Sequence, residues 1–276
     1  MKFMFAVLVF AIALPFGVAG QGKTGPRTKG ILLEDLTWLE AEKILTPSTV
    51  IVIPLGAAAK EHGPHLKLKN DFLIAEYLKR RVLQQADVVV APTLNYHFYP
   101  AFVEYPGSTT LRLETARDMV ADICRTLARF GPRRFYILNT GISTLRALRP
   151  TAELLAADWI LLRYTDLKML EPVEQVIRKQ EGGTHADEIE TSMMLYIDPA
   201  NVDMKKAVKD YRGNSPKGGL TRDPKKEGVY SPTGVWGDPT LATRGKGKTV
   251  TEALVSVILK EIADLRQAPL PGNTKH

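Results

Sequence analysis

The sequence predicts an α/β fold: one domain built on a mostly parallel sheet that helices cover on both faces. Three observations support this prediction. Apolar runs rich in β-branched residues alternate along the chain with segments of helical periodicity. These runs are apolar on both faces, which is typical of strands buried between two layers of helices. No linker separates two hydrophobic cores between residues 48 and 276.

The elements follow one another along the chain. The predicted strands are the apolar runs 49–55, 88–92, 134–139 and 159–164. The predicted helices are the segments in which apolar residues recur with helical spacing, 71–83, 113–130 and 250–265. Asp71 is the expected N-cap of the first helix, and Gly131-Pro132 ends the second. The stretch 213–247 is rich in glycine and proline and shows no periodicity, so it is either a functional loop or a flexible excursion.

Charge and composition exclude several classes of protein. The 276 residues carry a formal net charge of +7, but Lys and Arg are scattered and no RNP-like aromatic motif is present. We therefore expect a solvated basic surface and no nucleic-acid partner. The single cysteine, Cys124, excludes an intramolecular disulfide framework and a Cys-based zinc finger.

The N-terminus has the layout of a targeting segment. Lys2 precedes an almost wholly apolar run over 3–18, and small residues then stand before Gln21. This pattern predicts a secretory signal peptide over 1–20, and hence a periplasmic or secreted protein without a membrane partner after cleavage. An uncleaved membrane anchor is the alternative, because the run approaches the length that a bilayer needs. An N-terminal extension with a first helix, 21–47, would then precede the main domain, 48–276.

A first group of polar residues follows the predicted strand 49–55. Glu61, His62, His65 and Asp71 lie within eleven residues of one another, just beyond that strand. Ligands bind at the carboxyl ends of strands in parallel sheets, and imidazole with carboxylate oxygens suits Zn²⁺, Mn²⁺ or Fe²⁺. The alternative is a polar loop in which the histidines are incidental and Asp71 only caps a helix.

A second group contains His185 and Glu190. Thr184 and Asp187 have approximately the spacing of a capping box, which predicts a helix that begins near His185. A histidine and a carboxylate at a buried helix start suit a metal ligand and also a general acid–base pair. Acidic residues in a first turn also stabilise the helix dipole, which is the structural alternative.

Several segments occur in the order found in a known family. They are GAAAKEHGPHLKLKND, YPGST (105–109), ILNTGISTLRAL (137–148), HADEIETSMML (185–195) and GVWGDPTLAT (234–243). Together they resemble the creatininase (creatinine amidohydrolase) family. The resemblance implies a three-layer α/β/α fold in a single domain, usually assembled as a homo-oligomer. It also implies metal-dependent hydrolysis of C–N bonds in cyclic amides or formamides, with Zn, Mn or Fe as the metal.

The resemblance also assigns ligands, with two departures. The family's histidine and bridging aspartate ligands fall on His62 and Asp71, and the second motif adds Glu190 as a metal ligand and catalytic residue. Lys60 stands where the family has a glutamate ligand, so we expect Glu61 to take that role through a shift of the loop. Gly141 stands where the family has a further histidine ligand. We therefore expect one metal ion per subunit and doubt a second.

The function implied by this site is an exported, metal-dependent hydrolase. A metal-activated water would attack the C–N bond of a small-molecule substrate, and His185 would shuttle the proton to the leaving nitrogen. We expect His65, Glu104 and Trp236 to contact the substrate, and we do not expect creatinine itself, because the ligand loops differ. The alternatives are a non-catalytic binding protein or pseudoenzyme on the same fold, and a family enzyme of other chemistry, such as a lactonase or a peptide-trimming hydrolase.

Overall fold

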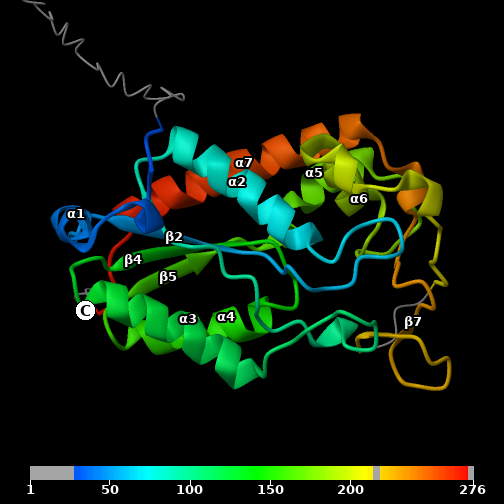
Figure 1. Cartoon of the computed structure of the whole chain (residues 1–276), viewed down its shortest axis with the longest axis horizontal. Helices are drawn as coiled ribbons and strands as arrows, with labels where there is room; N and C mark the ends of the chain where they lie inside the picture. The colour runs from blue at the N-terminus through cyan, green and yellow to red at the C-terminus, as the bar shows by residue number, and fades with distance from the viewer. Residues whose placement is uncertain (1–27, 214–217, 273–276) are drawn as a thin grey trace, which may run out of the picture.

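A five-stranded parallel sheet forms the middle layer of the protein (Figure 1). The computed structural model describes residues 28–213 and 218–272, so the predicted signal peptide lies outside the described residues. The strands are β1 (Ile31–Leu32), β2 (Val50–Leu55), β3 (Val89–Val90), β4 (Arg134–Asn139) and β5 (Leu161–Tyr164). They are arranged in the order β1-β3-β2-β4-β5, and every pair is parallel. The predicted fold class is confirmed.

Helices cover both faces of this sheet, as Figure 1 shows. The helices of one face are α2 (Asn70–Gln85), α5 (Glu171–Ile177), α6 (Glu188–Ile197) and α7 (Arg244–Gln267). The helices of the other face are α3 (Leu113–Ala128) and α4 (Leu145–Ala156). A short helix, α1 (Trp38–Ile44), lies near the amino ends of the strands and begins with a capping box between Thr37 and Glu40. None of the described helices is both long and apolar enough to cross a membrane.

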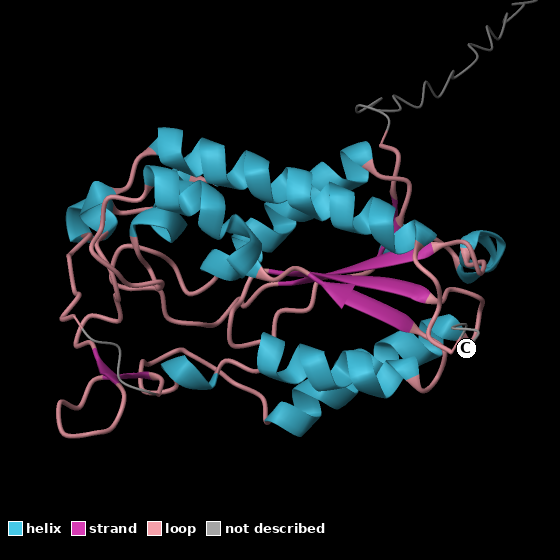
Figure 2. Cartoon of the chain, turned by 180° about the vertical axis from the view of Figure 1, so that it is seen from behind, coloured by secondary structure: helices cyan, strands magenta, loops and turns pink. Residues whose placement is uncertain are grey.

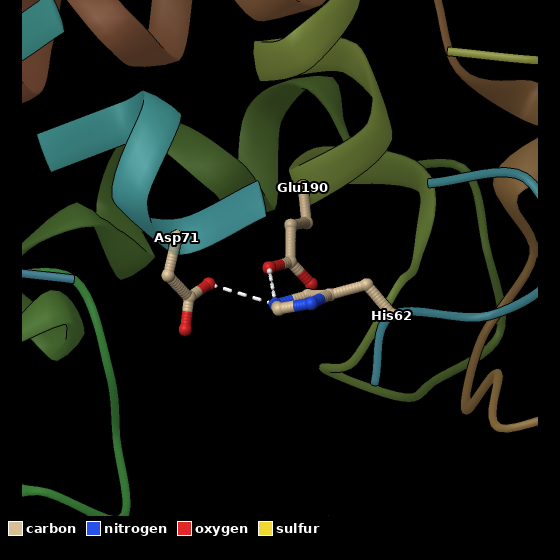
Figure 3. Close-up of side chains that lie close together, drawn as sticks. All are labelled: His62, Asp71 and Glu190. Carbon is tan, nitrogen blue, oxygen red and sulfur yellow. Dashed lines mark hydrogen bonds and ion pairs between the residues drawn. The ribbon is translucent and has the colours of Figure 1, made fainter. Parts of the chain in front are cut away.

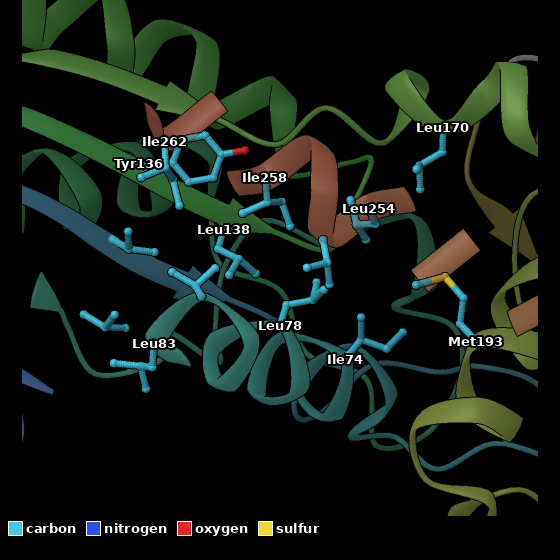
Figure 4. Packing of buried hydrophobic residues seen from close by; sticks show 14 of the residues in the cluster. Ile74, Leu78, Leu83, Tyr136, Leu138, Leu170, Met193, Leu254, Ile258 and Ile262 are labelled. Carbon is cyan, nitrogen blue, oxygen red and sulfur yellow. The ribbon is translucent and has the colours of Figure 1, made fainter. Parts of the chain in front are cut away.

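The sheet separates two hydrophobic cores. Val50 and Val52 of β2 point into the core under α2 and α7, whereas Ile51 and Ile53 point into the core under α3 and α4. Successive side chains of a strand point to opposite faces, so a strand between two helical layers must be apolar at every position. Figure 4 shows the first of these cores, whose members include Leu78 on α2, Leu254 on α7 and Leu138 of β4.

The carboxyl ends of the strands point toward one end of the molecule, where the long loops gather (Figure 2). Within the predicted irregular stretch 213–247, the described residues form two short paired strands, β6 (Leu220–Thr221) and β7 (Val229–Tyr230). Short 3-10 helices complete the connections: Leu33–Asp35, Pro100–Phe102, Leu167–Leu170, Pro199–Asn201, Met204–Lys206 and Pro239–Leu241.

Helix α7 begins earlier than the predicted 250–265, because it packs closely against α6. A Cβ atom on Gly247 would overlap the Ser192 carbonyl group of α6 and come within 3.0 Å of the Met193 backbone nitrogen. Gly247 is therefore the point at which the two helix backbones meet. The predicted strand 159–164 starts only at Leu161, since Trp159 has a left-handed φ of 61° and belongs to the preceding turn.

Candidate active site

Three predicted ligands meet where the loop after β2 passes between two helix starts. His62 comes from that loop, Asp71 from the first turn of α2 and Glu190 from the first turn of α6 (Figure 3). One donor atom from each lies within 4.8 Å of the other two, and this is the one such group among the described residues. Asp71 is not the N-cap of α2, as the sequence had suggested: Lys69 holds that position. The carboxylate of Asp71 is therefore available to His62.

Hydrogen bonding fixes which nitrogen of His62 faces the two carboxylates. Nδ1 lies 2.8 Å from the carbonyl oxygen of Lys60, which only accepts, so Nδ1–H donates to it. Nε2 lies 2.8 Å from Asp71 Oδ1 and 3.2 Å from Glu190 Oε1. Burial opposes a charge on this ring, but Asp71 and Glu190 outweigh it and raise the pKa of His62 to about 9. Nε2 therefore sits where a cation, either a proton or a metal ion, is strongly favoured.

The donor set fits a divalent metal ion. One imidazole nitrogen and two carboxylates suit Zn²⁺, Mn²⁺ or Fe²⁺. Despite burial, the pKa of Asp71 is held below its ordinary value by Lys60 and His62, and His62 holds that of Glu190 well below. Asn70 Nδ2 donates to Glu190 Oε1 at 3.0 Å. Outer partners of this kind orient ligands toward a metal.

Strained backbone holds Glu190 from the other side. The Ala186 N–H donates to Glu190 Oε2 at 2.7 Å, and Ala186 has a φ of 48°, which a residue with a Cβ seldom adopts. Helix α6 starts at Glu188 rather than near His185, because Asp187 is its N-cap and accepts from the backbone N–H of Glu190 at 2.9 Å. The expected capping box with Thr184 is therefore wrong, and His185 precedes the helix.

Glu61 does not join the metal group. Its Oε2 accepts a hydrogen bond from His185 Nε2 at 3.0 Å, and its Oε1 accepts from the Gly63 N–H. The backbone of Gly234, which has a φ of 81°, packs closely against this carboxylate. A Cβ atom on Gly234 would overlap the Glu61 side chain. Glu61 thus orients His185 in this structure, and its place among the ligands stays a prediction.

Lys60 occupies the side of Asp71 that His62 leaves free. Its Nζ lies 2.6 Å from Asp71 Oδ2 and 4.7 Å from the centre of the Phe102 ring. Burial opposes the charge, but Asp71 and then Glu190 outweigh it and raise the pKa of Lys60, so the group is an ammonium. Gly141 offers no side chain at the nearby end of β4. Sequence reasoning noted both departures but not this ion pair.

A pocket of about 550 Å³ opens onto these residues. Its wall includes Lys60, Phe102, His185, Glu190 and Trp236, the last being bridged to His185 by two backbone hydrogen bonds of 2.9 and 3.2 Å. Apolar residues of the segment 213–247 and of the hydrophobic core complete the wall, among them Leu220, Val229, Met193 and Leu254. Phe102 gave no signal in the sequence, because an isolated aromatic residue in a loop is equally typical of packing.

Two of the three predicted substrate contacts lie away from this wall. His65 is buried and shares a hydrogen bond of 2.8 Å with Thr191 Oγ1, so its ring is used inside the protein. Glu104 accepts a hydrogen bond from Thr221 at 2.8 Å and pairs with Lys226 at 3.0 Å. It therefore anchors the β6–β7 arm, the segment 220–230. Only Trp236 reaches the pocket, since backbone pairing with His185 holds it there.

Comparison with known proteins identifies the family. A family model described as "Creatininase: Creatinine amidohydrolase" matches residues 34–262. The chain belongs to the creatininase family. Two solved creatininase structures support the fold. One, described as "Creatininase Mn", has a TM-score of 0.73 at 24% identity and covers 87% of this chain and 100% of that one. A variant described as "Zn-Zn type" has a TM-score of 0.72 at 24% identity and covers 87% and 99%.

Relatives of this chain are named for different substrates. Creatinine amidohydrolase of Pseudomonas putida is 30% identical over 202 residues, 66% of this chain and 77% of that protein. A mycofactocin precursor peptide peptidase of Mycobacterium tuberculosis is 27% identical over 243 residues, 84% and 90% of the two chains. A 3-dehydro-scyllo-inosose hydrolase of Thermotoga maritima is 23% identical over 269 residues, 87% and 85% of the two chains. All three are hydrolases, and the chain is a hydrolase of the creatininase family.

Proposed function

We propose that this protein hydrolyses a C–N bond of the cyclic amide or formamide type in a small molecule, with one divalent metal ion held by His62, Asp71 and Glu190. One observation carries the proposal. His62 directs Nε2 at two carboxylates, buried Asp71 and partly buried Glu190, and its Nδ1–H is already used by a backbone carbonyl. A neutral ring in this position places a lone pair against two anions, which is stable only with a cation between them.

The residues around the ion would divide the chemistry. When bound, the metal ion supplies an activated water, whose pKa falls to about 7. His185 donates Nε2–H to Glu61, so Nδ1 is the atom that carries a lone pair in the neutral ring. Nδ1 lies 3.9 Å from Glu190 Oε2, beside the metal group. His185 is thus placed to take a proton on Nδ1 and to pass it to the leaving nitrogen, while Glu61 holds the ring in orientation.

A peptide C–N bond is the second candidate substrate. The match to the mycobacterial peptidase covers more of this chain than the match to creatinine amidohydrolase. Apolar residues such as Leu220 and Val229 in the pocket wall favour a substrate with an apolar part. Creatinine is not the substrate that we propose, since Lys60 and Gly141 stand at two expected ligand positions.

Further proposals concern the setting of the enzyme. We propose that residues 1–20 direct export, so that the protein works in the periplasm or outside the cell, because the segment has the three-part layout of a signal peptide. We also propose a homo-oligomer, as the family resemblance implies. Zinc or manganese is the metal that we propose, because related structures are described with these ions.

Metal content tests the proposed function. We expect about one equivalent of Zn or Mn in the purified protein by elemental analysis. Asp71→Ala should lose it, because one of the three proposed ligands is removed. Asp158→Ala is the control, since Asp158 pairs with Arg125 on the surface. Retention of metal by Asp71→Ala contradicts the ligand set. No metal in the wild type after reconstitution with each ion favours the non-catalytic binding protein.

A further inference from the structure

Lys60 places a positive charge where the pocket meets Asp71. The Lys60 side chain is 7% exposed, and its Nζ lies 2.6 Å from Asp71 Oδ2. Oδ2 receives no well-directed hydrogen bond from the described residues, so this contact is mainly electrostatic. Phe102 covers the ammonium at 4.7 Å from its ring centre, a distance at which a cation and an aromatic ring attract each other. Lys60 and Phe102 line the pocket, whereas Asp71 is not among the lining residues.

The two carboxylate oxygens of Asp71 therefore face two different positions, the proposed metal site and the Lys60 ammonium. Oδ1 faces His62 Nε2 and the metal group, and Oδ2 faces the ammonium of Lys60. A second metal ion bound to Oδ2 would lie about 2.0–2.2 Å from that oxygen. It would then be within about 5 Å of Nζ, where two positive charges in a buried site repel each other strongly. The ammonium thus blocks a second ion at Asp71.

The end of β4 offers no replacement ligand beside this position. Gly141 has no side chain, and its carbonyl oxygen accepts hydrogen bonds from Asn139 Nδ2 and Thr144 Oγ1 at 2.7 and 2.6 Å. Ser143 donates to the Phe98 carbonyl oxygen. The described residues at this edge therefore bring one fixed cation to Asp71, the ammonium, and no donor set for another metal ion.

We propose that the Lys60 ammonium replaces a second metal ion in this site: it limits the site to one ion and stabilises negative charge on the carbonyl oxygen of the substrate. This proposal rests on the proposed function. As the water oxygen bonds to the carbonyl carbon, the carbonyl oxygen gains the charge that the ammonium neutralises. When the C–N bond breaks, the extra electron pair on that oxygen re-forms the C=O bond. The C–N bonding pair leaves with the nitrogen, which takes the proton that His185 received from the water.

Metal titration of matched variants tests the first half of the proposal. Lys60→Met and Lys60→Gln remove the charge, Lys60→Arg keeps it, and Lys79→Met is the control. Lys79 is a similarly buried lysine, with a side chain 10% exposed, whose Nζ pairs with Glu34 at 2.9 Å outside the pocket. After far-ultraviolet circular dichroism confirms folding, metal-free proteins are titrated with Mn²⁺ by calorimetry, and bound Mn²⁺ is counted by elemental analysis.

The wild type, Lys60→Arg and Lys79→Met should bind one Mn²⁺ with the same affinity. Both uncharged variants should bind the first ion at least tenfold more tightly or gain a second equivalent, because a positive neighbour is gone. Two equivalents of Mn²⁺ in the wild type overturn the role of Lys60 but leave the proposed function standing. The same holds if both uncharged variants keep the affinity and stoichiometry of the wild type. No binding by any of the proteins overturns the proposed function as well.

A carboxylate probe tests the second half. Benzoate combines a negatively charged oxygen pair, like the product of amide hydrolysis, with a ring that suits the apolar wall. Binding of benzoate to the metal-loaded wild type, Lys60→Arg and Lys79→Met should be at least tenfold tighter than to Lys60→Met or Lys60→Gln. Equal affinity in charged and uncharged variants, or no binding in any of them, overturns the role assigned to the ammonium.

Discussion

Gly247→Ala should destabilise the protein by forcing α6 and α7 apart. The added Cβ would overlap the carbonyl oxygen and carbon of Ser192 and approach the Met193 nitrogen to 3.0 Å. These are backbone atoms, so no side-chain rotation can relieve the contact, and the helices must separate by roughly 1 Å. Overpacking of this kind typically costs about 1–3 kcal/mol. For a chain of this size, that loss corresponds to a decrease of roughly 2–5 °C in Tm.

Gly245→Ala is the matched control, two residues earlier in the same helix. Gly245 is exposed, and a Cβ there would come no nearer than 4.0 Å to any atom apart from its chain neighbours and the backbone of its own helix. Because alanine has a higher helix propensity than glycine, this change should be neutral or should stabilise the protein by up to about 1 kcal/mol. Urea denaturation of both variants and the wild type measures the difference. Equal stability of Gly247→Ala and Gly245→Ala would refute the close approach of the two helices.

Burial lowers the pKa of His97 to about 4, so the folded protein keeps it neutral while the unfolded chain takes up a proton near pH 6.5. The contribution of neutral His97 to the free energy of unfolding is therefore present above pH 6.5. It is lost as the pH falls toward 4, which lowers the free energy of unfolding by up to about 3 kcal/mol. His97→Phe should show a smaller loss of unfolding free energy between pH 7 and 4.5, and an unchanged loss would contradict this account. Once a substrate is found, His185→Ala should keep its metal and lose about 10²–10⁴ in kcat; loss of metal would instead make His185 a ligand.

Much of the fold could be predicted, because a buried parallel sheet leaves a strong pattern. The prediction for β4 matches its observed bounds, since Arg134–Asn139 is apolar on both faces and follows a Gly-Pro stop. Helix α4 was not predicted, because Pro150 lies inside it and proline normally ends a helix. The first residues of α7 were also missed, because Gly245 and Gly247 have low helix propensity, which packing against α6 overrides.

The short motifs predicted which side chains come together at the site, but not where neighbouring side chains point; the roles of these residues stay a prediction. His62, Asp71 and Glu190 meet as expected. Adjacent residues such as Lys60 and Glu61 point to different partners, Asp71 and His185, and their order in the sequence does not reveal which. Glu104 precedes a family-like segment, but its carboxylate turns to the β6–β7 arm, which lies more than a hundred residues further along.

The spacing of the three ligands along the chain sets when a metal ion can join the protein. His62 and Asp71 are separated by 9 residues, whereas about 120 residues lie between the start of α2 and Glu190. Joining such distant segments carries an entropic cost of loop closure that only the packed helices repay. The three side chains thus meet only after α6 has docked, so a metal ion at the proposed site would bind late in folding. Metal supply should therefore affect how firmly the finished protein resists unfolding more than how fast it forms.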